Sequence, residues 1–292
     1  MKTIIDLAIP AITFILLTTV GLDLTPADFD RVRQRQRIVA AGLVGPLLLL
    51  PPLAIALIWL FRPAPAVEAG LLLIAACPIG GISNTYSYLA RASTALSVTL
   101  TGISCLSAML TIPLLTTIFE LAMGHRLAFS PPVGMLAAQL AFMLALPVGL
   151  GMYVRRRWPR FADDHRGGFQ RVGFGALGLL VLLVVVDQAA LFREQFAETA
   201  LLALLFVGAS MSMGWAAGGL AGASRSDRFT LSVEFSTRNA AVATTIAVTI
   251  LGNVRFAVFA TTYFLVEMPL MLAAVAIFRA RTTSGDGRAG TP

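Results

Sequence analysis

Nine long apolar segments, separated by short polar stretches, make up most of the chain. Crossing the roughly 30 Å hydrocarbon core of a bilayer takes about 20 residues of α-helix, and each segment offers such a window. The expected spans lie at about 3–21, 37–60, 67–90, 94–122, 132–154, 172–191, 197–221, 228–251 and 254–278. The pattern predicts an all-α integral membrane protein with a single transmembrane domain over 1–278. Residues 279–292 are expected to form a short disordered cytoplasmic tail.

The third apolar segment is interrupted in its middle by residues that disfavour a helix. Pro78 removes a backbone donor and clashes with the preceding turn, while Gly80 and Gly81 lower the cost of leaving helical geometry. Irregular backbone at this depth is tolerated only where it is buried in protein or lines a wet cavity. The segment is therefore predicted to be centrally unwound, with a simple proline kink as the alternative.

The eighth apolar segment carries a polar run that includes Glu234, Arg238 and Asn239. An ionised side chain at mid-membrane costs about 3 kcal/mol on insertion scales, so such residues usually face a pathway or each other. Because Glu234 and Arg238 are four residues apart, a structural ion pair on one helix face is the alternative.

The two interrupted segments lie in corresponding halves of the chain. Paired, interrupted spans of this kind indicate a secondary transporter built from inverted repeats. With nine spans the two repeats cannot both be complete, so one is expected to lack its first helix.

Composition and charge agree with membrane residence. The chain is 57% hydrophobic and only 13% charged, whereas soluble domains keep about a quarter of their residues charged. The formal charge of +7 does not indicate nucleic-acid binding, because the basic residues cluster in short loops. Placing the N-terminus outside puts sixteen of the 22 basic residues on the cytoplasmic side, as the positive-inside rule requires.

Other classes of protein find little support. A signal peptide over Met1–Gly21 is a weaker interpretation than a retained first span, since no small-residue cleavage site follows. Cys77 and Cys105 lie in apolar segments and are expected to be buried free thiols. The sequence has no HExxH or GxSxG motif and no histidine in a predicted span, so we do not expect an enzyme. A sensor that binds a ligand without moving it remains an alternative.

Several of these stretches resemble the signature of the bile acid:sodium symporter family. They are Cys77–Asn84 (CPIGGISN), Tyr88–Ala90, Ala95–Thr101, Gly21–Phe29 and the polar run Glu234–Asn239. The resemblance covers essentially the whole chain and is to the bacterial, nine-span form. It implies core and panel helices, two crossing helices, and sodium-coupled symport of an organic anion by alternating access in the inner membrane. The implied anion is a bile-acid-like or small carboxylated solute, such as pantoate or a keto acid.

The resemblance also implies a sodium site, which matches Ser83, Asn84, Ser97, Thr101 and Glu234. Ser97 and Thr101 are four residues apart, so their hydroxyl groups share one helix face. A hard cation is bound by several oxygens, and hydroxyl, amide and carboxylate groups supply them. Ordinary interhelical packing is the alternative for the two hydroxyl residues.

This sequence departs from the family at the second sodium site. Arg238 stands where the family has a glutamine, and Ala41 stands near the position of another. We expect the guanidinium to occupy that position as a fixed charge, leaving one transported sodium. The rival possibility is that Arg238 faces the cavity and pairs with the anionic substrate. A sodium-independent or proton-coupled facilitator or exporter, in which Arg238 and Glu234 neutralise each other, is the alternative function.

Substrate binding is expected near the point where the two interrupted helices cross. There, helix N-termini present free amide donors to an anion. The residues assigned to it are Gly81, Ile82, Arg238, Asn239 and Glu267. Glu267, in the ninth span, contacts substrate, relays protons or pairs with Arg238. The partners expected are the organic anion and membrane lipid; the pattern does not indicate an oligomeric state.

Overall fold

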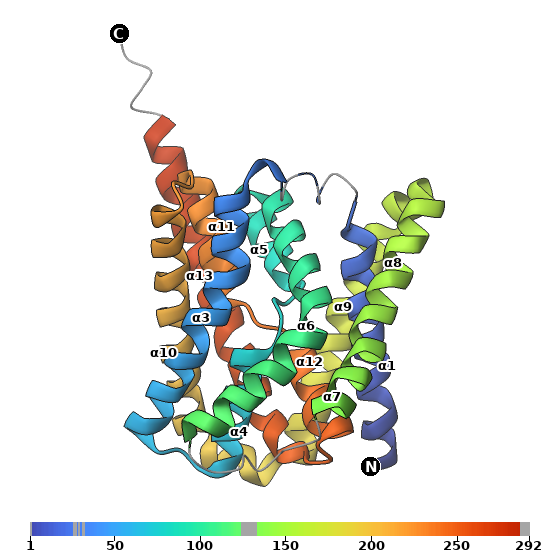
Figure 1. Ribbon diagram of the computed structural model, residues 1–292, viewed down its shortest axis with the longest axis vertical. Helices are drawn as coiled ribbons and strands as arrows, with labels where there is room; N and C mark the ends of the chain where they lie inside the picture. The colour runs from blue at the N-terminus through green and yellow to red at the C-terminus, as the bar shows by residue number, and fades with distance from the viewer. Residues whose placement is uncertain (1, 26–27, 29, 31–32, 124–132, 287–292) are drawn as a thin grey trace.

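The computed structural model describes residues 2–25, 28, 30, 33–123 and 133–286 (Figure 1). In this part of the chain the regular structure is helical, and the only β-type pairing is one isolated bridge between Ile79 and Arg238. The helices of the first half are α1 (Lys2–Asp23), α3 (Gln36–Phe61), α4 (Pro65–Ala76), α5 (Ile82–Leu89) and α6 (Thr94–Met123). Those of the second half are α7 (Val133–Leu140), η1 (Ala141–Ala145), α8 (Leu146–Arg157), α9 (Pro159–Asp187), α10 (Ala189–Leu220), α11 (Arg225–Ser236), α12 (Ala240–Thr245), η2 (Ile246–Ile250), η3 (Val254–Phe256) and α13 (Ala257–Asp286).

The helices follow the predicted apolar segments, with differences at their ends. α9 begins at Pro159 rather than near 172, and α13 continues through Asp286, past the predicted start of the tail at Arg279. Hydropathy detects only the apolar part of a helix, whereas backbone hydrogen bonding continues through the polar residues that flank it. Within the described residues, six helices are long and apolar enough to cross a membrane, and three shorter apolar helices accompany them. The all-α membrane class is thus supported, and the number of nine crossings stays a prediction.

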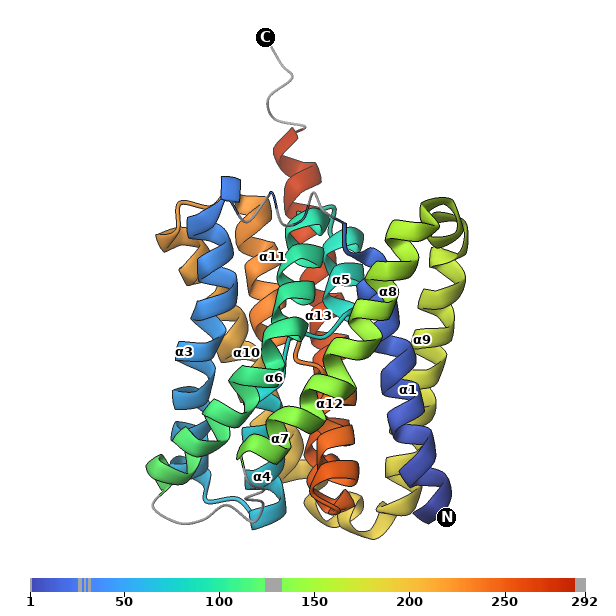
Figure 2. The same cartoon turned by 45° about the vertical axis from the view of Figure 1, so that its right-hand side comes forward.

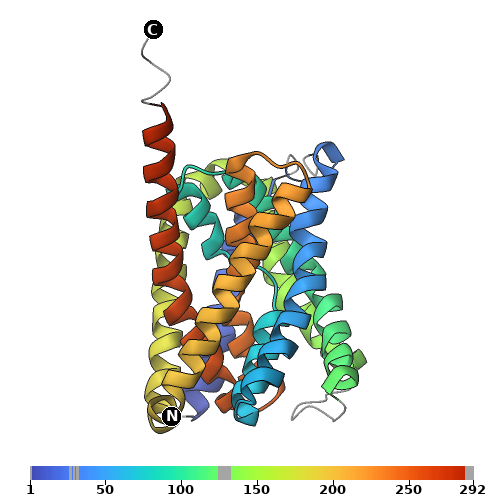
Figure 3. The ribbon, with the colours of Figure 1, turned by 90° about the vertical axis from the view of Figure 1, so that its left-hand side faces the viewer.

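The helices form two groups that lie side by side (Figure 2). α1, α8 and α9 pack on one another in the smaller group, and their close approach depends on glycine. A Cβ atom added to Gly21 of α1 would lie 2.1 Å from the carbonyl oxygen of Val148 in α8. The larger group contains α3, α4, α5, α6, α10, α11, α12 and α13. Figure 3 shows α10 lying across one face of this group, between α13 and α3.

The two interrupted segments run in opposite directions through the larger group. α4 starts at the lower end of the molecule in Figure 1 and α5 ends at the upper end, whereas α11 starts at the upper end and α12 lies below it. Residues 77–81 separate α4 from α5, and residues 237–239 separate α11 from α12. Opposite directions are what inverted repeats require. That each pair forms a single crossing of a membrane stays a prediction.

Burial differs between the inside and the outside of the bundle in the way a lipid environment requires. α4 is apolar on every side, and all its residues from Ala69 to Ala76 are buried. In contrast, large apolar side chains of the outer helices are exposed, among them Leu220, which is 92% exposed, and Leu121, which is 79% exposed. A helical surface this apolar is suited to contact with lipid rather than water.

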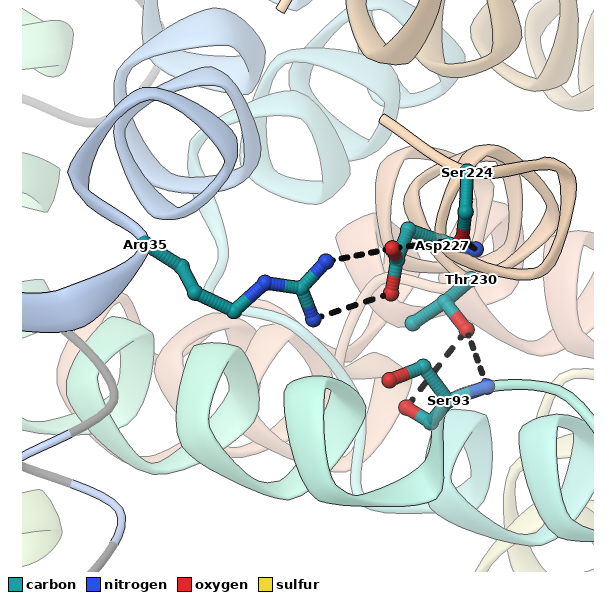
Figure 4. Close-up of polar contacts among 5 residues, drawn as sticks. All are labelled: Arg35, Ser93, Ser224, Asp227 and Thr230. Atoms are coloured by element: carbon teal, nitrogen blue, oxygen red, sulfur yellow. Dashed lines mark hydrogen bonds and ion pairs between the residues drawn. The ribbon is translucent and has the colours of Figure 1, made fainter. Parts of the chain in front are cut away.

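A polar network joins the starts of α3, α6 and α11 at one end of the bundle (Figure 4). The guanidinium of Arg35 donates to both carboxylate oxygens of Asp227, at 3.2 and 2.5 Å. Ser224 caps α11, since its hydroxyl oxygen accepts from the backbone N–H of Asp227 at 3.2 Å. The hydroxyl of Thr230 accepts from the backbone N–H of Ser93 at 3.0 Å. Three elements that are distant in sequence are therefore tied together at this end.

Asp227 precedes the apolar span at 228–251, and its charge contributes to stability. Burial raises its pKa, but the hydrogen bonds from Arg35 and Ser224 outweigh burial and lower the pKa below its ordinary value. A carboxyl group with a lowered folded-state pKa stabilises the fold above the unfolded-state pKa, and this contribution is lost as pH falls through the folded-state pKa.

We expect Asp227→Asn to lower the free energy of unfolding by about 2 kcal/mol at neutral pH, because it weakens a charge-assisted bidentate contact. The exposed pair of Arg155 and Asp163 offers a matched control, and Asp163→Asn should cost less than about 1 kcal/mol. Thermal unfolding of both variants measures the difference. Equal losses in the two variants would contradict a special role for the Arg35–Asp227 pair, as would a difference that persists at strongly acidic pH.

Candidate ion and substrate site

The two interruptions meet at mid-height of the bundle and are joined by backbone hydrogen bonds (Figure 1). The N–H of Gly80 donates to the carbonyl oxygen of Thr237, and the N–H of Asn239 donates to that of Pro78, both at 2.9 Å. A Cβ atom at position 80 would lie 3.1 Å from the carbonyl oxygen of Arg238, so glycine permits this approach. The paired bonds satisfy backbone groups that leave the helical ladder, which is essential at membrane depth.

All five residues expected to bind sodium lie together behind this crossing. The hydroxyl of Ser97 donates to Oε1 of Glu234, and its oxygen lies 2.8 Å from Oδ1 of Asn84. Thr101 Oγ1 lies 3.2 Å from Oε2 of Glu234 and 3.1 Å from the hydroxyl oxygen of Ser83. Each of the five side chains is buried, and that of Glu234 is 0% exposed. The cluster brings oxygens from α5, α6 and α11 to one point.

The chemistry of this cluster suits a hard cation. It offers two carboxylate oxygens, one amide oxygen and three hydroxyl oxygens, which are the ligand types that such cations prefer. The part of the chain that the structure describes contains no group of three His, Cys, Asp or Glu residues placed to hold a metal ion. A fully buried carboxylate is stable only if its charge is compensated. A cation with oxygen ligands would supply that compensation.

Arg238 lies in the second interruption and is not paired with a carboxylate. Its guanidinium donates to the carbonyl oxygen of Cys77, and its backbone N–H donates to the hydroxyl of Tyr263 at 2.8 Å. Nε and Nη1 have no hydrogen-bond partner, although the residue is only 4% exposed. Among the described ion pairs, none joins Arg238 to Glu234 or Glu267. The structural ion pair that the four-residue spacing allowed is therefore not formed.

A partly open cavity of about 70 Å³ lies between the two groups of helices at this crossing. α1 and α9 of the smaller group line one side, and both interruptions line the other. The lining includes four residues assigned to substrate from the sequence, which are Gly81, Ile82, Arg238 and Asn239. Asn84 belongs to both the cavity wall and the oxygen cluster, so the two sites share a side chain.

Glu267 is not among the residues that line this cavity. Its carboxylate accepts hydrogen bonds from Thr237 and Tyr86 on the inner side of α13. Conversely, the cavity includes Thr19 and Asp23 of α1, which the sequence assignment omitted. Asp23 lies within the stretch Gly21–Phe29 that carries part of the family resemblance, and the resemblance could therefore have suggested it as a cavity residue. Nothing in the sequence marked Thr19 as a cavity residue, because a single hydroxyl residue in an apolar span is common.

Comparison with known proteins gives one family and several relatives. Residues 10–195 match the sequence model of the sodium bile acid symporter family. The chain is 28% identical over 148 residues to a probable chloroplastic sodium/metabolite cotransporter of Oryza sativa subsp. japonica, covering 51% of this chain and 34% of the relative. It is 26% identical over 167 residues to a sodium-dependent organic anion transporter of Bos taurus, covering 57% and 43%.

A third relative is an uncharacterized sodium-dependent transporter of Bacillus subtilis (strain 168). The identity is 30% over 141 residues, covering 48% of this chain and 42% of the relative. In all three cases the alignment spans less than half of the relative's own length.

Proposed function

The chain belongs to the sodium bile acid symporter family, and we propose that it is a secondary active transporter that carries an organic anion together with sodium. The matched relatives are sodium-dependent transporters and not enzymes. Sodium coupling in general is thus supported by the family, while the ion site, the substrate and the number of ions are proposals.

The observation that carries the proposal is the buried oxygen cluster of Ser83, Asn84, Ser97, Thr101 and Glu234. It lies directly behind the crossing of the two interruptions and shares Asn84 with the cavity. A cation bound by this cluster would neutralise Glu234 and draw α5, α6 and α11 together. The amide of Asn84 would then transmit occupancy of the ion site to the cavity, which is the coupling that symport requires.

The substrate proposed for the cavity is an organic anion with an apolar body. Most of the lining is apolar, and Arg238 adds a buried guanidinium with two free nitrogens. The backbone at Gly81 and Ile82 and the side chain of Asn239 complete the polar part of the site. One relative is named an organic anion transporter, which agrees with this class.

We propose one sodium ion per cycle. The guanidinium of Arg238 would replace the family's second ion as a fixed charge, because that position lacks the two glutamine ligands. Arg238 forms no ion pair with Glu234, so Glu234 is available for sodium. This weighs against the mutual neutralisation of Arg238 and Glu234. The alternative of a sodium-independent carrier, which needed that neutralisation, is accordingly less favoured.

Alternating access would involve motion of the smaller group, α1, α8 and α9, against the larger group. The cavity lies at their boundary, so such a motion would open it to one side and then the other. Within this scheme the chain forms one transporter domain of nine crossings in the bacterial inner membrane.

The orientation proposed has the N-terminus outside and the C-terminus inside. α1 begins and α13 ends at opposite ends of the bundle, as an odd number of crossings requires (Figure 1). Arg35 at the start of α3, Arg155 in the last turn of α8 and Arg225 at the start of α11 all belong to the upper end in that view. The excess of basic residues there supports the proposal that this end is cytoplasmic.

Sodium is expected to stabilise the purified protein when compared with choline at equal ionic strength. A ligand at about 100 times its Kd adds about 2.7 kcal/mol to the free energy of unfolding, which raises the melting temperature. Uptake of labelled cholate, pantoate or pyruvate into proteoliposomes should require an inward sodium gradient. Absence of both the sodium-specific stabilisation and sodium-dependent uptake would overturn the proposal.

A further inference from the structure

A second buried carboxyl group lies near the crossing, apart from the oxygen cluster. Glu267 lies in the first half of α13 and is 1% exposed. Its Oε1 accepts from the hydroxyl of Thr237 at 2.8 Å, and its Oε2 accepts from the hydroxyl of Tyr86 at 3.4 Å. No arginine or lysine side chain that the structure describes forms an ion pair with it.

An ionised carboxylate in this position would be costly. Taking a carboxylate out of water carries a large desolvation penalty, and each hydrogen bond to the charged group recovers only part of it. One of the two hydrogen bonds to Glu267 is long, at 3.4 Å, and therefore weak. The two bonds together do not compensate for the cost of burying the ionised carboxylate. Binding a proton removes the charge and the penalty with it.

A proton suits Glu267 better than a metal cation. The cluster around Glu234 surrounds its carboxylate with three hydroxyls and an amide, whereas Glu267 has hydroxyl contacts only from Thr237 and Tyr86. Hard cations take about six or more oxygen ligands, and the contacts of Glu267 fall short of this. A proton needs a single acceptor oxygen.

The ionisable groups near Glu267 do not supply a counter-charge. Tyr86 of α5 donates a hydrogen bond to it, Tyr263 lies one turn before it on α13, and no ion pair joins it to Arg238 of the second interruption. Cys77 and Glu234 are acidic groups and cannot supply a positive charge. α12 contains no ionisable side chain. The remaining ionisable residues of the elements that pack on α13 lie toward their ends and include Glu68 of α4, Asp187 of α9, Glu198 of α10 and Arg255 of η3.

We propose that Glu267 is a proton-binding site whose occupancy changes during the transport cycle, so that this carrier uses a proton in addition to sodium. An O–H bond forms on one carboxylate oxygen with a proton taken from water on one side, and it breaks to return the proton to water on the other. No electrons are transferred. The binding of the proton stands on the burial of Glu267 alone, whereas its coupling to transport rests on the proposed function.

The partners of Glu267 give this coupling a physical route. Tyr86 belongs to α5, and Thr237 belongs to the interruption between α11 and α12. The proposed motion of the smaller group opens the cavity, whose wall includes Thr85 beside Tyr86 and Phe264 one turn before Glu267. Water that enters there would reach the hydrogen bond between Tyr86 and Glu267 from the cavity side. The carboxyl group would then lose its proton, because water solvates the charged carboxylate and removes the desolvation penalty.

Infrared difference spectroscopy of the full chain in liposomes tests proton binding directly, at a saturating sodium concentration so that a cation rather than a proton compensates Glu234. The wild type should show the carbonyl stretch of a protonated carboxylic acid, and this band should disappear as pH is raised. The band should survive in Glu234→Gln and in the exposed control Glu198→Gln, and it should be missing in Glu267→Gln. A wild type without the band, or a band that persists in Glu267→Gln, would overturn the proposal whether or not sodium is transported.

Uptake under combined gradients tests the coupling. With a fixed sodium gradient, an inward proton gradient of about one pH unit should raise the accumulation of labelled cholate, pantoate or pyruvate by up to about tenfold for one proton per cycle. Glu198→Gln should respond like the wild type, whereas Glu267→Gln should show no response to the proton gradient. A wild type that ignores the gradient, or a Glu267→Gln variant that responds to it, would overturn coupling through this residue.

Discussion

Replacement of Glu234 by glutamine is expected to weaken sodium binding at least about 100-fold. The variant keeps the shape of the side chain but removes the only formal negative charge in the oxygen cluster, and its new amide donors compete with the hydroxyls of Ser97 and Thr101. Removing one partner of a buried charge pair typically costs 3–5 kcal/mol, and each 1.4 kcal/mol corresponds to about tenfold in affinity.

Two measurements report this change. Sodium should no longer raise the melting temperature of Glu234→Gln, and uptake should fall to the level seen with choline. Glu194→Gln is a suitable control, because Glu194 is an exposed glutamate near the start of α10 and should retain the wild-type response. Sodium stabilisation that survives in Glu234→Gln at wild-type affinity would place the ion elsewhere and remove the basis of the proposed site.

The second large effect is expected from restoring the family's glutamines. The double variant Ala41→Gln/Arg238→Gln replaces a fixed cation with two oxygen ligands at the position of the second sodium ion. We expect the sodium Hill coefficient of uptake to rise from about one in the wild type to about two, because the two amide oxygens supply ligands for a second ion and the competing guanidinium charge is gone. Arg238→Gln alone supplies only one of the two ligands, so its Hill coefficient should remain near one while uptake weakens.

Initial rates of uptake measured over a range of sodium concentrations give these coefficients. The matched control is Arg255→Gln, which removes an arginine from the exposed end of the bundle at η3 and should leave the coefficient unchanged. A wild-type coefficient near two would contradict the replacement of an ion by Arg238. Loss of anion binding in Arg238→Gln with an unchanged sodium response would instead favour a direct contact between the guanidinium and the substrate.

Much of the architecture could be predicted because hydrophobicity is a local property. Each apolar segment has a helix in the structure, and the interruptions at 77–81 and 237–239 coincide with Pro78, with the adjacent glycines and with the polar run at Glu234. Helix ends were predicted less well, as the start of α9 shows, because polar residues continue a helix beyond the apolar part that hydropathy detects.

The five members of the oxygen cluster were chosen by resemblance and by the spacing of Ser97 and Thr101. Periodicity placed those two hydroxyls on one face of α6, but it could not bring Asn84 of α5 and Glu234 of α11 to the same point. Their contacts join residues separated by as many as 137 positions in the chain. Such contacts depend on how whole helices pack, and no local pattern records that.

The sequence by itself thus determined that the chain is a helical membrane protein with two interrupted segments, because membrane residence and helix breaking depend on nearby residues. Only the tertiary structure decided the partners of the charged side chains. It placed Arg238 beyond ion-pair distance of Glu234, and it moved Glu267 from the cavity wall to a buried position beside Tyr86 and Thr237. A helix carries its side chains on every side, and the packing of its neighbours determines which side faces an ion, a substrate or the protein interior.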